Sequence, residues 1–332
     1  MSYITVIGGG SWGTALAMLL AKKDYDVTMW VNEADLVERM KETYINDVFM
    51  PDVKLPENLN FTNSMEECLP NARYVVSVVP TQYVRGVFKN VAGLLKDDAV
   101  IVSASKGIEK GTLKTVSEIL SELVSNKIAV LSGPSFAKEV VNEVPTAVSL
   151  ASYDTDTSYM LQEIFNTEYF RVYTNFDVKG VEIGGALKNV MAIASGICEG
   201  LHLGRNTRAA LLTRGIAEML RLGLKMGSDP QTFSGLSGMG DLILTCTSTM
   251  SRNYTVGVKL GQGIKLSEII SSTKSVAEGV ETSVSARELA IKKKVEMPIV
   301  EKVYEVLHED KNALDALREL MNRPLKTEFY TE

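Results

Sequence analysis

The stretch "YITVIGGGSWGTALAMLLAKK", residues 3–23, sets the architecture of the first half of the chain. A short apolar run leads into Gly8, Gly10 and Gly13 with the spacing GxGxxG, and an apolar helical segment follows. In this context Gly8 permits a tight turn, Gly10 lets the backbone approach a pyrophosphate, and Gly13 lets the helix pack closely on the strand. The helix N-terminus offers free amides to the phosphates. The pattern predicts a dinucleotide-binding loop; the alternative is a glycine-rich turn without a ligand.

The next predicted strand ends at Trp30, where a dinucleotide site distinguishes between two cofactors. An acid there accepts the ribose 2′-hydroxyl of NAD, whereas an arginine suits the 2′-phosphate of NADP. This chain has Asn32 and Glu33 at that place. Glu33 favours NAD if it points inward, but it could equally be a solvated surface acid. The sequence leaves the choice between NAD and NADP open.

Short apolar runs recur through the first half of the chain, with amphipathic helical segments between several of them. The runs predicted as strands are "YITVIG", "VTMW", "YVVSVV", "AVIVSAS", "KIAVLSG" and "TAVSLA". This alternation predicts a doubly wound, mostly parallel sheet. Beyond about residue 178 the apolar residues recur with helical spacing, which predicts an all-α second half. We expect a Rossmann domain at 1–178 and a helical substrate-binding domain at 179–332. No Pro- or Ser-rich linker separates them, so they should pack closely.

Composition narrows the possible functions. The 332 residues carry a net charge of -6, so no global basic field exists to hold nucleic acid or an anionic membrane. An anionic ligand would therefore need a local cluster of cations. The three cysteines form no CxxC pair and the two histidines cannot build a His-rich metal site, so we expect reduced thiols and no metal. The absence of a secretory signal and of a long apolar run predicts a cytoplasmic protein.

Lys188 is the least expected residue of the second half. It stands in "GVEIGGALKNV", beside the apolar stripe of a predicted helix, and its neighbours on the helical wheel are Gly184, Gly185, Ala192 and Ser195. The default interpretation is a solvated surface lysine, and the small residues could also admit a packed helix. A third possibility is a notch that leaves room for a ligand beside a partly desolvated ammonium group, with its pKa lowered for acid–base work.

Three other segments place polar side chains where a ligand could lie. Asp241 is followed by Ser251, Arg252 and Asn253, a donor-rich triplet suited to phosphate that could equally be a helix N-cap. Lys106 comes just after a predicted parallel strand, and ligands of open α/β sheets bind at that edge. Gly133 and Ser135 follow another strand, where they form either a simple turn or a substrate-binding one.

Taken together, these segments resemble the bacterial NAD(P)-dependent sn-glycerol-3-phosphate dehydrogenases. The resemblance is carried, in order, by "GGGSWGTALA", "SASKGIE", "GPSFAKEV", "GALKNVMAIASGICEGL", "TRGIAEMLRLG", "GLSGMGDLILTCTS" with "SRN", and "SVAEGVETS". They span nearly the whole chain. The resemblance implies interconversion of dihydroxyacetone phosphate and sn-glycerol 3-phosphate, a supply of glycerol 3-phosphate for phospholipid synthesis, and a homodimer.

The resemblance also implies roles for individual residues. Lys188 would be the catalytic proton donor and acceptor, Asp241 would orient it or balance its charge, and Lys106 would assist at the junction of the domains. The implied substrate-binding residues are Lys106, Gly133, Ser135, Lys188, Asp241, Ser251, Arg252 and Asn253. The implied cofactor-binding residues, added to the three glycines of the loop, are Ser11, Trp12, Asn32, Lys106, Ala137, Arg252, Val276 and Glu278.

Some features depart from the family pattern, and two other functions stay open. The loop reads GGG where GAG is frequent, and Asn32 with Glu33 replaces a frequent basic residue, which puts NADP preference in doubt. His202 stands where a glycine is common, and we expect a surface or loop residue there. The alternatives are a related 6-phosphogluconate-type or other hydroxy-acid dehydrogenase, which would not explain "GDLILTCTS" with "SRN", and a non-enzymatic dinucleotide sensor, which would not need Lys188.

Overall fold

The computed structural model describes residues 3–271, 277–325 and 327–328. The strands are β1 (Tyr3–Ile7), β2 (Asp26–Trp30), β3 (Ile45–Asn46), β4 (Met50–Lys54), β5 (Leu59–Thr62), β6 (Tyr74–Ser77), β7 (Val100–Ser103), β8 (Lys127–Ser132), β9 (Thr146–Ser152) and β10 (Phe170–Asn175). The helices of the first half are α1 (Ser11–Ala21), α2 (Ala34–Thr43), α3 (Met65–Cys68), α4 (Thr81–Val91), α5 (Val116–Leu123), α6 (Ala137–Val141) and α7 (Thr155–Phe165).

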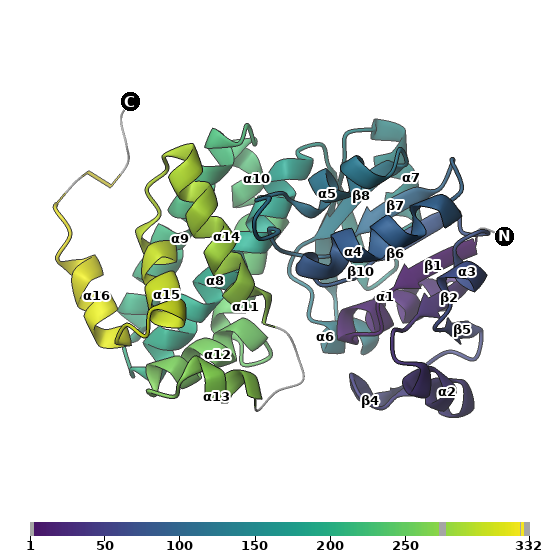
Figure 1. Ribbon diagram of the computed structural model, residues 1–332, viewed down its shortest axis with the longest axis horizontal. Coiled ribbons are helices and arrows are strands. Elements are labelled where there is room, and N and C mark those ends of the chain that lie inside the picture. The colour runs from purple at the N-terminus through teal and green to yellow at the C-terminus, as the bar shows by residue number, and fades with distance from the viewer. Residues whose placement is uncertain (1–2, 272–276, 326, 329–332) are drawn as a thin grey trace.

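The second half is helical in the part that the structure describes. Its helices are α8 (Val178–Gly200), α9 (Arg205–Lys225), α10 (Pro230–Ser234), α11 (Asp241–Thr247), α12 (Arg252–Gly261), α13 (Leu266–Ser271), α14 (Glu278–Lys293), α15 (Pro298–His308) and α16 (Ala313–Met321), with a π-helical turn, η2, at Leu236–Gly240. Figure 1 shows the α/β half of the molecule on the right and the helical half on the left. The two halves meet along a seam. The predicted division into an α/β half and an all-α half is confirmed.

The sheet has the strand order β10-β9-β8-β7-β6-β1-β2-β5. Neighbouring strands are parallel except for β8 and β9, which are antiparallel. All six predicted strands are present, and the mostly parallel prediction is confirmed. Sequence analysis missed β5, β10 and the small β3–β4 pair. In β10, Arg171 and Tyr173 face outward on the sheet edge, so this strand lacks the continuous apolar run of a central strand.

The strand order reverses between β1 and β6, and this switch point sets where a ligand can bind. Both strands are parallel, so their carboxyl ends meet at one edge of the sheet. The glycine-rich loop follows β1 there, Pro80 precedes α4 just after β6, and Lys106 follows β7. In open α/β sheets the crevice at such a point is the usual ligand site.

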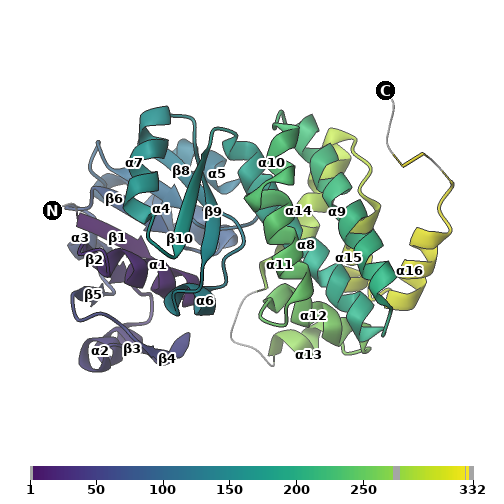
Figure 2. The same ribbon diagram turned by 180° about the vertical axis from the view of Figure 1, so that it is seen from behind.

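Helix α8 is the centre of the helical half, surrounded by α9, α11, α12, α14 and α15 (Figure 2). Its 23 residues are long and apolar enough to cross a membrane, so the expectation that no long apolar run exists is wrong. All of its apolar window is buried inside the protein, as in a core helix. Glycines let α12 approach α8 very closely. A Cβ on Gly196 would lie 2.0 Å from the Tyr254 carbonyl oxygen, and one on Gly257 would lie 2.1 Å from that of Ile193. The two backbones are therefore in direct contact, which fixes α12 and the Arg252 at its start.

The seam between the halves begins directly after the last strand. β10 ends at Asn175, and the Asp177 side chain accepts a hydrogen bond of 2.9 Å from the Gly180 amide, which caps α8. Helix α8 then packs against β8, since a Cβ on Gly185 would lie 2.8 Å from Ser132 Oγ. The seam is close-packed at this point.

Candidate active site

A cleft of about 1120 Å³ lies along the seam, at the switch-point edge of the sheet. Its walls come from both halves of the chain. Thirteen of the site residues that the resemblance implies line it: Gly8, Gly10, Ser11, Trp12, Asn32, Lys106, Ser135, Ala137, Lys188, Ser251, Arg252, Asn253 and Glu278. Gly13, Gly133 and Asp241 do not line the cleft surface, and Val276 lies outside the described residues. One cleft therefore brings together residues that are up to 270 positions apart.

The glycines of the loop have different steric surroundings. Gly8 has φ 128°, and a Cβ there would lie 2.7 Å from the Val78 carbonyl oxygen. A Cβ on Gly13 would lie 2.0 Å from the Gly8 carbonyl oxygen, so this position closes the turn against the helix. A Cβ on Gly10 would meet nothing within 4 Å. Two glycines are thus required by the fold, whereas the third keeps open the space in front of the α1 N-terminus.

The N-terminus of α1 presents unsatisfied donors to the cleft. Gly10 is its N-cap residue and provides no side-chain cap, so the first amides of the helix have no intrahelical partner. Trp12 Nε1 is buried and has no hydrogen-bond partner among the described residues. Across the cleft, Arg252 Nη2 donates a hydrogen bond of 3.4 Å to Ser11 Oγ. This end of the cleft has the donors and the positive potential that a phosphate group requires.

Lys188 is buried beneath the cleft, with only 8% of its surface exposed. Its Nζ donates to Thr245 Oγ1 at 2.8 Å and lies 3.1 Å from Asp241 Oδ1. The other carboxylate oxygen, Asp241 Oδ2, lies 2.6 Å from Lys106 Nζ. Two ammonium groups, one from each half of the chain, therefore share one buried carboxylate. The interpretation of Lys188 as a solvated surface lysine is therefore wrong.

Lys106, Lys188 and Asp241 lie close enough to change one another's pKa values, and burial changes them as well. Burial lowers the pKa of Lys188, and Lys106 adds to this effect while the Asp241 carboxylate opposes it. Burial alone would raise the pKa of Asp241, but the two ammonium groups outweigh it and hold that pKa below its ordinary value. A carboxylate that stays ionised and a lysine that loses its proton more readily than usual suit proton transfer.

The glycines beside Lys188 do not form the notch suggested by the helical wheel. A Cβ on Gly184 would lie 2.7 Å from the Ser237 carbonyl oxygen in η2, and one on Gly185 would lie 2.8 Å from Ser132 Oγ and 3.5 Å from Lys106 Cγ. The small residues therefore admit protein rather than ligand, and the interpretation that they leave room for substrate is wrong. Their effect is to bring Lys106 and the turn before Asp241 up to α8.

Gly133 and Ser135 lie beside Lys106. Gly133 has φ 140°, and its carbonyl oxygen accepts a hydrogen bond of 2.9 Å from Lys106 Nζ. A Cβ at this glycine would lie 2.9 Å from Val148 Cα in the neighbouring strand. Ser135 Oγ donates to the same carbonyl oxygen at 3.1 Å and reaches the cleft surface. This turn both holds Lys106 and exposes a hydroxyl to the cleft.

The Ser251–Asn253 triplet has a capping role as well as a place in the cleft. Ser251 is the N-cap residue of α12 and accepts a hydrogen bond of 3.2 Å from the Tyr254 amide. Arg252 is exposed on the first turn. The two interpretations of this segment are therefore compatible, because the cap aims the arginine into the cleft.

Three polar contacts near the site were not assigned from the sequence. Thr245 bridges Lys188 and Asp241, and its position four residues after Asp241 on one helix could have indicated this. Asn189 Oδ1 accepts a hydrogen bond of 2.9 Å from Asn253 Nδ2, which ties α8 to α12. Thr81 donates its amide (3.0 Å) and its hydroxyl (3.2 Å) to Glu278 Oε1 across the seam. Thr81 and Glu278 are 197 positions apart in the sequence, so no local pattern predicts their hydrogen bonds.

The remaining residues discussed from the sequence, Asn32, Glu33 and His202, do not contact the Lys106, Lys188 and Asp241 group in any of the hydrogen bonds and ion pairs described above. Asn32 and Glu33 line the cleft after β2, with Glu33 at the N-cap of α2. His202 is exposed in the turn after α8 with φ 56°, a conformation that favours glycine. Among the described residues no group of three His, Cys, Asp or Glu side chains could hold a metal ion.

A doubly wound sheet with a glycine-rich loop at its switch point, facing a buried lysine from a helical domain, defines the class as an NAD(P)-dependent oxidoreductase. Comparison with known proteins gives the family. The descriptions that match are "NAD-dependent glycerol-3-phosphate dehydrogenase N-terminus" over residues 3–158 and "NAD-dependent glycerol-3-phosphate dehydrogenase C-terminus" over residues 177–318. The chain belongs to the NAD-dependent glycerol-3-phosphate dehydrogenase family.

Relatives match along the whole length. Glycerol-3-phosphate dehydrogenase, NAD(P)+, of Geobacter sulfurreducens is 56% identical over 329 residues, covering 98% of each chain. The crystal structure of glycerol-3-phosphate dehydrogenase from Coxiella burnetii is 40% identical, with a TM-score of 0.94 and coverage of 97% of this chain and 99% of that one. A D-mandelate dehydrogenase structure, at 12% identity and a TM-score of 0.66, shares the fold alone.

Proposed function

We propose that this chain interconverts dihydroxyacetone phosphate and sn-glycerol 3-phosphate by hydride transfer with NAD(P)H, with Lys188 as proton donor and acceptor. The observation that carries the proposal is the shared carboxylate: Asp241 lies between Lys188 (3.1 Å) and Lys106 (2.6 Å) below the cleft. The names of the full-length relatives support the substrate.

The residues of the cleft fit a dinucleotide. Gly10 leaves open space before the uncapped N-terminus of α1, and Trp12 Nε1 is a buried donor with no partner among the described residues. Gly8, Ser11, Asn32, Ala137 and Glu278 would complete the cofactor site, as would Gly13 by closing the turn. When bound, the nicotinamide supplies or accepts the hydride. We propose that residues 1–178 hold this cofactor and residues 179–332 provide most of the catalytic groups.

The residues of the chain account for the remaining steps. As the substrate carbonyl is reduced, negative charge grows on its C2 oxygen, and the Lys188 ammonium stabilises this charge and donates a proton. In the oxidation direction Lys188 accepts the hydroxyl proton. Asp241 stays ionised and holds both lysines in place. Contacts across the seam place Lys106 and Lys188 on the same carboxylate.

Substrate orientation depends on groups remote from the reacting carbon. Arg252 would bind the phosphate with its planar set of donors, assisted by Ser135, Asn253 and the capped start of α12 at Ser251. Gly133 would act by holding Lys106 through its carbonyl oxygen, which accepts at 2.9 Å. Binding energy from the phosphate would then orient the carbonyl against Lys188.

We further propose a cytoplasmic homodimer that supplies glycerol 3-phosphate for phospholipid synthesis. The support is the resemblance of the whole chain to its relatives. Asn32 and Glu33 leave the choice between NAD and NADP open, so the test must use both.

The test is to mix purified protein with dihydroxyacetone phosphate and follow oxidation of NADH and NADPH separately at 340 nm. The proposal expects turnover with at least one cofactor and none with 6-phosphogluconate or another hydroxy acid in the reverse direction. Cofactor binding without turnover of dihydroxyacetone phosphate would contradict it. Reaction with a hydroxy acid instead would support the related dehydrogenases that share this fold.

A further inference from the structure

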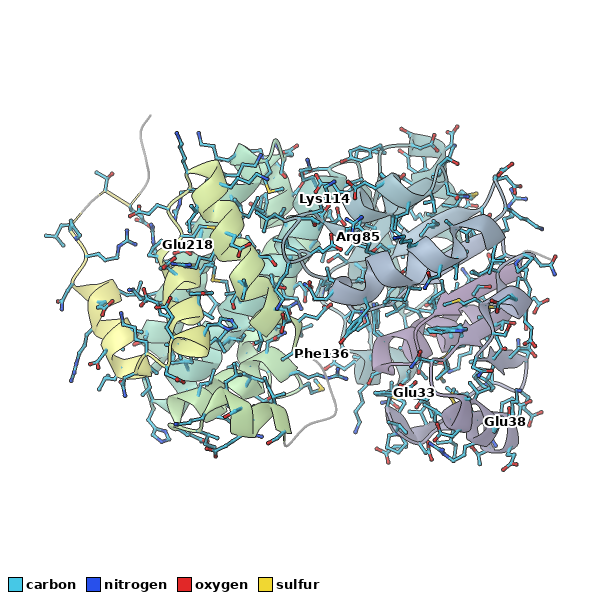
Figure 3. All side chains as sticks on the ribbon, in the orientation of Figure 1. Glu33, Glu38, Arg85, Lys114, Phe136 and Glu218 are labelled. Carbon is cyan, nitrogen blue, oxygen red and sulfur yellow. The ribbon has the colours of Figure 1, made fainter. Side chains whose placement is uncertain are left out.

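A second cavity lies on the other side of the seam from the cleft. It has a volume of about 450 Å³ and shares no lining residue with the cleft. Its walls are the segment before α5, α5 itself, the turn after β9, and parts of α8, α9 and α14. In Figure 3 the labelled Lys114, which lines this cavity, lies at the upper part of the seam, and Phe136, which lines the cleft, lies below it. We call this second hollow the seam cavity.

Cations dominate the seam cavity. Lys114, Lys179, Lys292 and Lys293 line it, against the single carboxylate of Glu118. This surplus of positive charge stands out in a chain whose net charge is -6. Like charges repel, so four lysines around one hollow raise the local positive potential and favour a bound anion.

Two of these lysines, Lys114 and Lys179, are already in ion pairs. Lys179 Nζ lies 3.1 Å from Glu118 Oε1, and Lys114 pairs with a carboxylate outside the cavity lining. For Lys292 and Lys293, in the last turn of α14, no ion pair is found within the described ranges 3–271, 277–325 and 327–328. Their side chains are exposed. The pair is therefore available to an incoming anion without first breaking a contact.

The rest of the lining is mixed in character. Leu113, Met226 and Leu289 give it an apolar wall, and Ser117 and Tyr153 add hydroxyl groups. A solvated lysine cluster on an open surface has no such wall beneath it. Apolar side chains beside a few polar groups are typical of small-molecule sites. The lining fits a ligand with an apolar body and a multivalent anionic group.

We propose that the seam cavity binds a phosphate monoester with an apolar body, its phosphate held by Lys292 and Lys293. Neither residue belongs to the proposed active site, so the proposal does not depend on the reaction. The cavity walls come from both halves of the chain, and a bound ligand contacts both. Binding to the folded state alone also raises the melting temperature as ligand concentration rises.

The test is isothermal titration calorimetry of the full chain with phenyl phosphate, a monoester with an aromatic body. The variant is Lys292→Ala/Lys293→Ala, in which alanine keeps a good helix former at both positions. The matched control is Lys89→Ala, which removes an exposed lysine in the last turn of α4 that lines neither cavity. The double variant should raise the Kd about tenfold or more, since each lysine gives up a charge-assisted contact. Lys89→Ala should leave the Kd unchanged.

Further titrations distinguish binding in the seam cavity from binding in the cleft. They also compare the whole ligand with its aromatic and phosphate parts. The cleft is itself proposed to bind a phosphate ester through Arg252, so the titrations are repeated in Arg252→Ala. In that background phenyl phosphate binding, and its weakening by Lys292→Ala/Lys293→Ala, should both persist. Phenol and inorganic phosphate should each bind more weakly than phenyl phosphate. The proposal is overturned if the wild type does not bind, if the double variant binds as the wild type does, if binding is lost only in Arg252→Ala, or if either fragment binds as tightly as the whole.

Discussion

The two sides of the seam are anchored alike, but the cleft side also holds a buried carboxylate, Asp241, between two ammonium groups. On the cleft side Glu278 accepts a hydrogen bond of 3.0 Å from the Thr81 amide at the start of α4. On the far side Glu182 accepts one of 2.7 Å from the Ser117 amide at the start of α5. In each case a carboxylate of the helical half caps a helix of the sheet half, where unsatisfied amides and the helix dipole favour negative charge.

The difference appears in the pKa values. Burial raises the pKa of Glu182 to about 6, because its partners are an amide and hydroxyl groups rather than cations. Asp241 is equally buried, yet Lys106 and Lys188 hold its pKa below the ordinary value. Burial alone therefore does not decide the ionisation of a carboxylate here. The nature of its partners does. Asp241 pairs directly with two ammonium groups, whereas Glu182 and Glu278, whose pKa burial also raises, accept hydrogen bonds from amide and hydroxyl donors.

The largest effect should follow removal of the lysine from the cleft side. Lys188→Ala should lower kcat by about 10³-fold, because proton transfer and stabilisation of the C2 oxygen are both lost. Binding of NAD(P)H, measured by fluorescence titration, should stay within about threefold of the wild type, since Lys188 Nζ is held by Thr245 and Asp241 in the helical half. A variant that keeps its turnover, or that loses cofactor binding while folded, would remove Lys188 from the proposed role.

Removal of the Arg252 side chain should have a smaller effect than removal of Lys188, and it should change KM rather than kcat. Arg252→Ala should raise KM for dihydroxyacetone phosphate roughly 10- to 100-fold through loss of charge-assisted hydrogen bonds to phosphate. Its contact with Ser11, at 3.4 Å, predicts some weakening of cofactor binding as well. Steady-state kinetics against both ligands would measure this, and an unchanged KM for the substrate would show that the phosphate binds elsewhere.

On the far side the expected effect is on stability rather than rate. The folded pKa of Glu182 is raised from 4.5 to about 6, so the folded state holds a proton that the unfolded state has released. Stability should therefore fall as pH rises through that window, by about 2 kcal/mol in total. In Glu182→Gln the glutamine at this position does not titrate, so wild-type stability minus variant stability, from urea unfolding, should decline by most of this amount between pH 4.5 and 7. A difference that does not vary with pH would contradict this assignment.

The smallest change should come from the glycine loop. Gly10→Ala adds a Cβ with nothing within 4 Å and φ of -69°, so the melting temperature should stay within about 1 °C. The Kd for NAD(P)H should still rise about tenfold, because the methyl group occupies the space before the α1 amides. Gly13→Ala is the contrasting control and should destabilise the fold, since its Cβ would lie 2.0 Å from the Gly8 carbonyl oxygen. Equal melting temperatures for both variants would contradict the distinction.

Sequence reasoning predicted most of the sheet because its central strands are buried on both faces and therefore read as continuous apolar runs. Strand β10 escaped detection because half of its side chains face outward. The glycines of the GxGxxG motif are required by the geometry of a single strand–turn–helix segment, so the dinucleotide-binding loop could be predicted from the local sequence. Lys188 could be singled out, but a helical wheel does not show what faces a glycine, so Gly184 and Gly185 were misinterpreted as a ligand notch. Glu182, Thr81 and the seam cavity depend on contacts between distant segments that leave no local pattern.

In the proposed mechanism Asp241 raises the proton affinity of Lys188 against the effect of burial. The most direct test of this effect is the pH dependence of kcat for sn-glycerol 3-phosphate oxidation in the wild type and in Asp241→Asn. Oxidation needs the neutral amine of Lys188, and the Asp241 carboxylate raises the pKa of that amine while burial lowers it. The rise of kcat with pH should therefore move to lower pH in Asp241→Asn, in addition to any loss of rate. A profile that stays in place, or that moves to higher pH, would contradict it.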